Sequence, residues 1–134
     1  MADKNDFLLR IISPDRVFYE NQVDMVEFNT TEGEIGVLPG HIPMTVVIKP
    51  GILTITEEEE TKTAALHAGF VEILQDSVTV LAEIVEWPTE IDTERAEAAR
   101  QRAEERIKNH TPETDMARAE TALLRAMARI SILK

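Results

Sequence analysis

From about residue 7 to residue 87, hydrophobic residues occur in short runs that turn-forming residues separate. The runs are rich in Val, Ile, Phe and Thr, and Ser77 to Leu81 alternates between polar and apolar side chains, as a half-buried strand does. The runs cover residues 7–12, 16–19, 23–28, 35–38, 44–48, 52–56, 62–67, 70–74 and 78–85. Many short strands at close intervals are typical of a β-sandwich or β-barrel, which we predict for residues 1–87.

Beyond residue 87 the hydrophobic period changes from two residues to the 3.6 residues of a helix. Thr89 or Asp92 can act as the N-cap of a first helix, and Thr111 followed by Pro112 suits the start of a second. We therefore predict an antiparallel helical hairpin for residues 88–134, with helices at about 92–108 and 113–133.

The two predicted helices carry unequal hydrophobic stripes. The first stripe is mostly alanine and the second contains larger residues: Ala96, Ala99, Ala103 and Ile107 face Met116, Leu123, Met127 and Ile130. A buried Leu or Met side chain contributes about 1.5 to 3 kcal/mol, whereas alanine contributes about one methyl group's share. We therefore expect a hairpin that is only marginally held in one position.

The charge is concentrated in the strand-rich part. Residues 1–87 contain 16 acidic and 5 basic residues, and residues 88–134 contain 9 of each, for a net charge of −11. This acidic balance argues against nucleic acid as a partner, because binding phosphates requires a basic patch. The chain has no cysteine, its first six residues lack the basic start of a signal peptide, and no apolar stretch is long enough to insert into a membrane. We expect a soluble, cytoplasmic protein.

Two arginines of the second helix lack the acidic neighbours that surface helices usually provide. Arg125 and Arg129 have no acid three or four residues away and are each other's fourth neighbour, which is repulsive. On the first helix, Arg95 and Arg102 share a face. These guanidinium groups can converge on one anion such as a phosphate, and the alternative is a solvated or partner-facing basic stripe. Since the chain has no P-loop motif, side chains and helix ends would hold any nucleotide.

The sequence offers little for catalysis or metal binding. His41, His67 and His110 lie in different predicted elements without a metal-ligand spacing, so we expect no metal site. Glu83 and Glu86 resemble an acid–base pair, but residues three apart on a strand point to opposite faces. A small stand-alone enzyme that uses either residue is therefore a weak alternative, and we predict no catalytic residue and no hydrolysis of a bound nucleotide.

Several motifs resemble the epsilon subunit of bacterial F-type ATP synthases, in particular its Bacillus-like, ATP-binding members. The resemblance runs along the whole chain through the segments Gly33 to Met44, Ile48 to Gly51, Gly69 to Glu72 and Ile91 to Ala96. The first, rich in glycine and proline, is the most specific. The resemblance implies a β + α protein, in which a two-layer β-sandwich of about ten strands precedes the two-helix hairpin.

The resemblance also implies a place in a larger complex. Members of the family are non-catalytic rotor subunits of the central stalk, bound to the gamma subunit and the c-subunit ring, and they couple proton flow to ATP synthesis. Their location is the cytoplasmic face of the bacterial plasma membrane, peripheral through the synthase. The residues that correspond to their rotor contacts are Thr31, Glu32, Gly33, Glu34 and His41.

In this family the hairpin moves, and the resemblance implies the same here. Folded against the sandwich it permits catalysis; extended toward the alpha and beta subunits it inhibits ATP hydrolysis. In ATP-binding members the nucleotide, with or without magnesium, is a regulatory ligand that stabilises the folded form. The corresponding residues are Glu86, Ile91, Asp92 and Ala96 around the base and sugar, and Arg95, Arg102, Arg125 and Arg129 at the phosphates. The alternative is the same subunit without ATP sensing, whose hairpin arginines contact acidic surfaces of the catalytic head.

Overall fold

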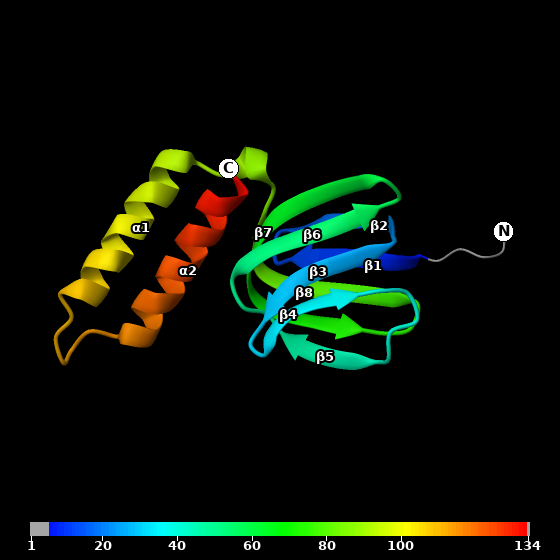
Figure 1. Ribbon diagram of the computed structural model, residues 1–134, viewed down its shortest axis with the longest axis horizontal. Coiled ribbons are helices and arrows are strands. Elements are labelled where there is room, and N and C mark those ends of the chain that lie inside the picture. Colours follow the sequence, from blue (N-terminus) through cyan, green and yellow to red (C-terminus); the bar gives the residue numbers. More distant parts are fainter. Residues whose placement is uncertain (1–5, 134) are drawn as a thin grey trace.

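The computed structural model describes residues 6–133 and contains a β-sandwich followed by a two-helix hairpin (Figure 1). This confirms the predicted fold class. The elements in chain order are β1 (Phe7–Ser13), β2 (Arg16–Val23), β3 (Met25–Thr30), β4 (Gly33–Val37), β5 (Met44–Val47), β6 (Gly51–Glu57), β7 (Glu60–Ile73), β8 (Ser77–Glu86), the short 3₁₀-helix η1 (Pro88–Glu90), α1 (Thr93–Lys108) and α2 (Met116–Ile132).

The strands pair in the order β2-β1-β8-β7-β6-β3-β4, and β5 pairs with β7. All these pairs are antiparallel except the parallel pair of β1 and β8. Strand β1 shows how the sequence builds the core, because Phe7, Leu9 and Ile11 point inward while the residues between them remain partly exposed. The core is almost entirely aliphatic and aromatic, with side chains from both layers of the sandwich.

The described residues form eight strands rather than about ten, chiefly because β7 is longer than expected. The runs at 62–67 and 70–74 belong to one strand, whose first half pairs with β6 and whose second half pairs with β5. The bend lies at Ala68 and Gly69, with φ angles of 36° and 134°. A Cβ atom at Gly69 would lie 2.1 Å from the Leu81 carbonyl oxygen, so only glycine fits there. Strand β7 thus pairs with β6 before this bend and with β5 after it, within the same sheet.

The second helix begins later than expected. We placed its start at about residue 113, capped by Thr111, but α2 starts at Met116 and Asp115 is its N-cap. The Asp115 carboxylate accepts a hydrogen bond from the Arg118 backbone N–H at 3.0 Å. Thr111 instead closes a turn with Thr114, whose N–H donates to the Thr111 carbonyl at 3.0 Å. A carboxylate four residues further on therefore provides the cap.

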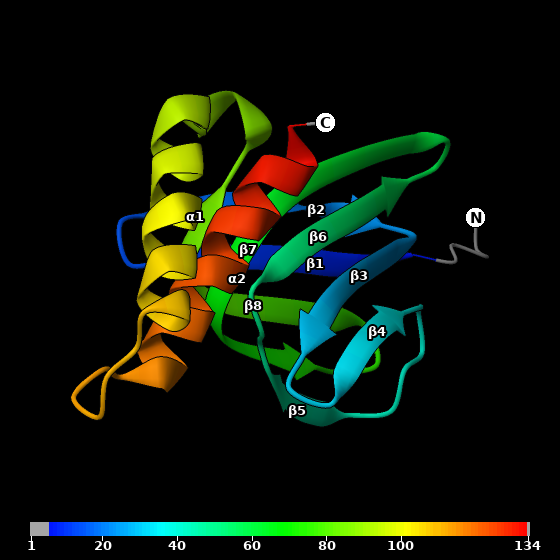
Figure 2. The same cartoon turned by 60° about the vertical axis from the view of Figure 1, so that its left-hand side comes forward.

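Helix α2 lies between α1 and the sandwich, as two views of the molecule agree (Figures 1 and 2). The expected stripe of larger residues on α2 is only partly buried: Met116, Leu123 and Ile130 are half-buried, and Met127 is 48% exposed. The fully buried residues of the hairpin are alanines instead: Ala96, Ala103, Ala119, Ala126 and Ala128. Small side chains let the helices approach closely but bury little apolar area.

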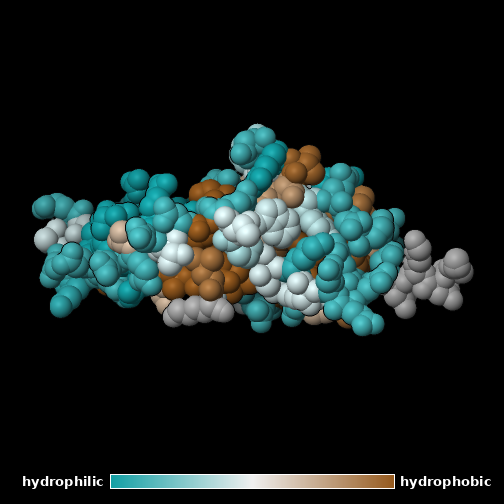
Figure 3. Space-filling view, turned by 90° about the horizontal axis from the view of Figure 1, so that it is seen from above, coloured by the Kyte–Doolittle hydropathy of each residue, from teal (hydrophilic) through white to brown (hydrophobic). Residues whose placement is uncertain are grey.

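The hairpin covers the sandwich incompletely. A groove of about 290 Å³ between α2 and the start of β6 is lined in part by Leu124 and Met127. Seen from above, hydrophobic side chains remain visible at the junction between the hairpin and the sandwich (Figure 3). Because little apolar surface is buried here, polar contacts at the junction contribute substantially to the stability of the docked hairpin.

Candidate functional site

The linker between β8 and α1 is fastened to the sandwich. The Arg16 guanidinium donates to both carboxylate oxygens of Glu90 at 2.8 and 2.9 Å, and Glu90 also accepts from the Trp87 backbone N–H at 2.8 Å. These bonds, the one from Trp87 first, hold the pKa of Glu90 below its usual value. The Trp87 ring stacks on Phe18 with 4.3 Å between ring centres. The chain is therefore anchored as far as Glu90, and α1 begins only after Asp92.

Asp92 and the first turn of α1 then form one wall of a pocket. The Asp92 Oδ1 atom accepts from the Arg95 backbone N–H at 3.2 Å, which makes Asp92 the N-cap of α1. This cap places Arg95 and Ala96 beside the linker, and Arg102 follows two turns later. Ala96 is 2% exposed, so its backbone comes close to the neighbouring elements.

The pocket has a volume of about 270 Å³ and lies where the sandwich, the linker and both helices meet. Seven of the eight predicted nucleotide-site residues line it: Glu86, Ile91, Asp92, Arg95, Ala96, Arg102 and Arg129. They come from β8, the linker, α1 and α2, so a molecule bound here would contact every part of the junction. Glu90 and Ala99 also line the pocket; our sequence analysis did not select them. Ala99 lies one turn after Ala96, a spacing that could have identified it.

Glu86 and Arg129 connect the two domains directly. The Arg129 Nε–H donates to the Glu86 Oε1 atom at 2.7 Å, and both side chains are about a quarter exposed, at 25% and 26%. Arg129 therefore has an acidic partner. This partner is the last residue of β8 and does not come from the helix of Arg129 itself. Arg95 and Arg102 form no ion pair with any described residue, which leaves their guanidinium groups available to an anion.

Arg125, the eighth predicted residue, does not line the pocket. It lies one turn before Arg129 on α2, and its Nε atom is buried without a hydrogen-bond partner among the described residues. Next to the pocket residue Glu86 lies His67, which our sequence analysis did not assign to any site. Its side chain is fully buried, and its Nε2 atom is 3.5 Å from Glu86 Oε1.

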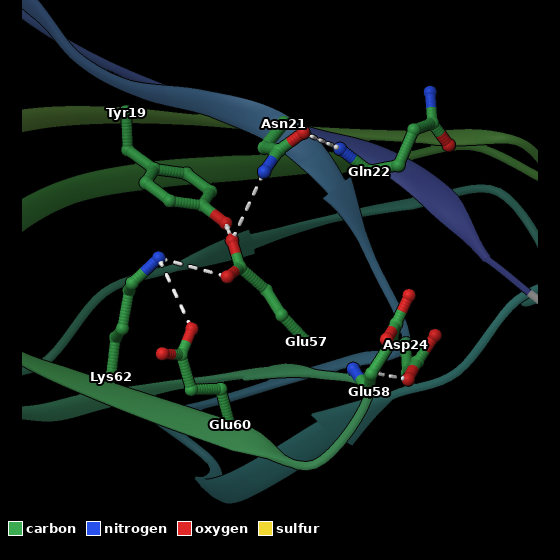
Figure 4. Close-up of polar contacts among 8 residues, drawn as sticks. All are labelled: Tyr19, Asn21, Gln22, Asp24, Glu57, Glu58, Glu60 and Lys62. Carbon is green, nitrogen blue, oxygen red and sulfur yellow. Dashed lines mark hydrogen bonds and ion pairs between the residues drawn. The ribbon is translucent and has the colours of Figure 1, made fainter.

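A larger hollow, of about 610 Å³, lies at the tip of the β6–β7 hairpin and is lined mainly by acidic residues. Glu57 is bonded internally there (Figure 4): it accepts from the Tyr19 hydroxyl, from Asn21 Nδ2 at 3.2 Å and from Lys62 Nζ at 2.8 Å. The Glu58 backbone N–H donates to Asp24 at 2.7 Å. These contacts tie neighbouring strands together, and the negative lining would repel phosphates.

The residues predicted to contact the rotor lie apart from the pocket, at another edge of the sandwich. Thr31 and Glu32 form the turn between β3 and β4, Gly33 and Glu34 begin β4, and all four line a hollow of about 370 Å³ together with β5. The Thr30 hydroxyl holds this turn, accepting from the Glu32 N–H at 3.1 Å and donating to the Gly33 carbonyl at 2.7 Å. His41 is half-buried in the segment before β5, where its Nδ1 atom is 2.7 Å from the Ile42 carbonyl.

Within residues 6–133, no group of three or more His, Cys, Asp or Glu residues is arranged to hold a metal ion. In the same part of the chain, neither helix has the length and apolarity that crossing a bilayer requires.

Comparisons with known proteins agree with this architecture. Residues 6–88 match the family model of the ATP synthase delta/epsilon chain β-sandwich domain, and residues 89–134 match that of its long α-helix domain. The ATP synthase epsilon chain of Bacillus licheniformis is 40% identical over 94% of this chain and 96% of its own length. That of Caldanaerobacter subterraneus is 42% identical over 94% and 92%.

Two solved structures share the fold. One chain from the cryo-EM structure of the Euglena gracilis mitochondrial ATP synthase OSCP/F1/c-ring superposes with a TM-score of 0.85 at 22% identity, covering 98% of this chain and 83% of that one. A second, from the central stalk and c-ring of the Tetrahymena thermophila enzyme, gives 0.68 at 13% identity, covering 99% and 100%. With both family models matched along residues 6–134, this chain belongs to the ATP synthase epsilon-chain family.

Proposed function

We propose that this protein is a non-catalytic rotor subunit in the central stalk of a bacterial F-type ATP synthase. It turns with the gamma subunit and the c-subunit ring at the cytoplasmic face of the plasma membrane, and so couples proton translocation to ATP synthesis. The family match along the chain supports this role. So do the two structural neighbours, which come from complexes that include a c-ring.

The outer face of the sandwich offers a surface for the gamma subunit. Val47, Phe70 and Leu81 lie side by side on β5, β7 and β8 and are 55%, 45% and 36% exposed. A row of large hydrophobic side chains across adjacent strands favours a protein partner. Residues 31–34, the β3–β4 turn and the start of β4, lie beside the same strand β5 and support the proposed contact with the c-ring.

We further propose that ATP is a regulatory ligand of the pocket at the hairpin junction, and that it is bound without being hydrolysed. The observation that carries this proposal is that one pocket collects residues from the sandwich, the linker and both helices. Glu86, Ile91, Asp92 and Ala96 suit the base and sugar, and Arg95, Arg102 and Arg129 suit the phosphates. Arg125, one turn away on α2, would need to turn toward the pocket to join them.

Such a ligand stabilises the folded hairpin against the extended form that inhibits ATP hydrolysis at the alpha and beta subunits. A ligand that binds only the folded form stabilises it by about 2.7 kcal/mol at 100 times its dissociation constant. The buried hairpin surface consists largely of alanine, so this free energy is large enough to decide which form is populated.

A second candidate keeps the subunit but not the ATP site. It is favoured by one observation, that Arg129 already has an anionic partner in Glu86. On this alternative the arginines of α2 contact acidic surfaces of the catalytic head once the hairpin extends. Inhibition of the assembled enzyme would then depend strongly on salt, and calorimetry would detect no ATP binding to the isolated chain.

The test is calorimetric titration of the full chain with ATP, with and without magnesium, and analysis of the product for ADP. We expect binding without hydrolysis, and a loss of about tenfold or more in affinity for Arg102→Ala, since a charge-assisted bond to phosphate is removed. Arg106→Ala is the matched control, because Arg106 lies on the same helix but outside the pocket. Equal affinities for wild type and Arg102→Ala would refute the assignment of the pocket.

A further inference from the structure

His67 is a buried histidine whose polar atoms are not satisfied. It lies at the bend of β7, directly before Ala68, and its side chain is 0% exposed. Neither of its ring nitrogens has a hydrogen-bond partner among the described residues. Buried polar groups in folded proteins are normally bonded, so a fully enclosed imidazole without bonds needs an explanation.

The charged neighbours of His67 come from β8 and α2. Its Nε2 atom lies 3.5 Å from Glu86 Oε1, beyond a good hydrogen bond, while Arg129 bonds the same oxygen at 2.7 Å. Burial, followed by the positive charge of Arg129, lowers the pKa of His67 to about 4; Glu86 opposes this shift and Arg125 adds to it. The imidazole is therefore neutral near pH 7 and keeps one N–H to donate.

Arg129 bonds the Glu86 carboxylate and also lines the pocket, so a phosphate bound there would compete with Glu86 for its guanidinium group. A phosphate carries more negative charge than a carboxylate and fits the guanidinium group well, so bound phosphates draw Arg129 away from Glu86. Glu86 is only 26% exposed and would lose its close partner. Among the described residues, the His67 ring is the other nitrogen donor beside this carboxylate, and a small rotation of Glu86 would bring the two within bonding distance.

We propose that His67 is a positioning residue of the pocket. Its Nε2–H donates a hydrogen bond to the Glu86 carboxylate, in place of Arg129, when Arg129 turns to the phosphates of a bound nucleotide. This inference rests on the nucleotide site proposed above. Glu86 then stays in place for the base or sugar while Arg129 is released. Because the bond from His67 forms fully only in the bound form, it adds to ligand affinity and not to the stability of the free protein.

The experiment measures ATP affinity by calorimetry, and urea stability without nucleotide, for full-length His67→Leu, His67→Gln and His110→Leu. We expect His67→Leu to bind ATP about tenfold more weakly, as for a lost bond to a charged group, with equal or higher stability because two buried, unbonded nitrogens are removed. His67→Gln retains a neutral N–H donor and should recover part of the affinity. His110→Leu, at an exposed turn outside the pocket, should match wild type in affinity.

In a Glu86→Ala background, His67→Leu should cause no further loss of affinity, because the two residues act through one bond. Wild-type affinity in His67→Leu would overturn the inference and leave the proposed ATP site standing. A parallel loss of affinity and stability that His67→Gln does not restore would also overturn it, since that result indicates a purely structural histidine. If the wild-type chain binds no ATP, the proposed site and this inference both fail.

Discussion

The bond between Glu86 and Arg129 should stabilise the docked hairpin measurably. It joins residues 43 positions apart, from β8 and α2, by one charge-assisted contact of 2.7 Å. A hydrogen bond to a charged group is worth about 1.5 to 3 kcal/mol, and solvent screening at side chains that are one quarter exposed lowers the value. We therefore expect a coupling free energy of about 1 to 2 kcal/mol from a cycle of Glu86→Gln, Arg129→Gln and the double variant.

The assay is urea unfolding without nucleotide, followed by far-ultraviolet circular dichroism, to which the helices contribute most. The chain offers a matched control in Arg10 and Glu20, which form the same type of Nε–H bond at 2.9 Å but are 41% and 47% exposed. Exposed pairs contribute about 0.2 to 1 kcal/mol, so this control cycle should lie well below the junction pair. If both cycles give the same coupling, the junction pair does not hold the hairpin and the reasoning is refuted.

Three further predictions concern stability. Gly69→Ala should destabilise the protein by about 3 kcal/mol or more in urea unfolding, because the new Cβ would overlap the Leu81 carbonyl oxygen and the backbone φ at this position is 134°. Gly36→Ala is the control: the nearest neighbours of its Cβ would be 3.6 Å away, so stability should change by less than about 1 kcal/mol. Asp92→Ala and Asp115→Ala each remove an N-cap and should each cost about 1 kcal/mol, but only Asp92→Ala should also weaken ATP binding in calorimetry. The pKa of His67 is lowered from 6.5 to about 4, so on acidification its imidazole takes up a proton in the unfolded chain before it does so in the folded one. The free energy of unfolding should therefore fall as the pH drops from about 6.5 to 4. Urea titrations across this range should show a smaller fall for His67→Leu than for wild type.

The fold class and several local features follow from the order of residues. Alternation places the β1 residues Phe7, Leu9 and Ile11 in the core, and Asp92, one of the two caps that the sequence predicts, is the N-cap of α1. These are short-range effects of side-chain periodicity and backbone capping, and neighbouring residues suffice to produce them.

Two boundaries depended on more than the local pattern. The sequence analysis predicts Thr111 as the cap of the second helix, whereas α2 begins after Asp115, and local propensity does not separate these two residue types. Similarly, the gap at residues 68–69 between two predicted apolar runs suggested two strands, but β7 continues because β5 replaces β6 as its partner there. In each case the choice depends on which contacts the rest of the chain can make.

The sequence alone, through its resemblance to a family, named the arginines and the start of α1 as a possible anion site. Spacing also showed that Arg129 lacks an acidic neighbour within its own helix. Only the tertiary structure revealed that Glu86 supplies the missing partner and that His67 lies buried beneath the pair. Burial and long-range pairing arise when α2 packs onto β6 and β7, and no short stretch of sequence encodes the distance between residues 43 positions apart.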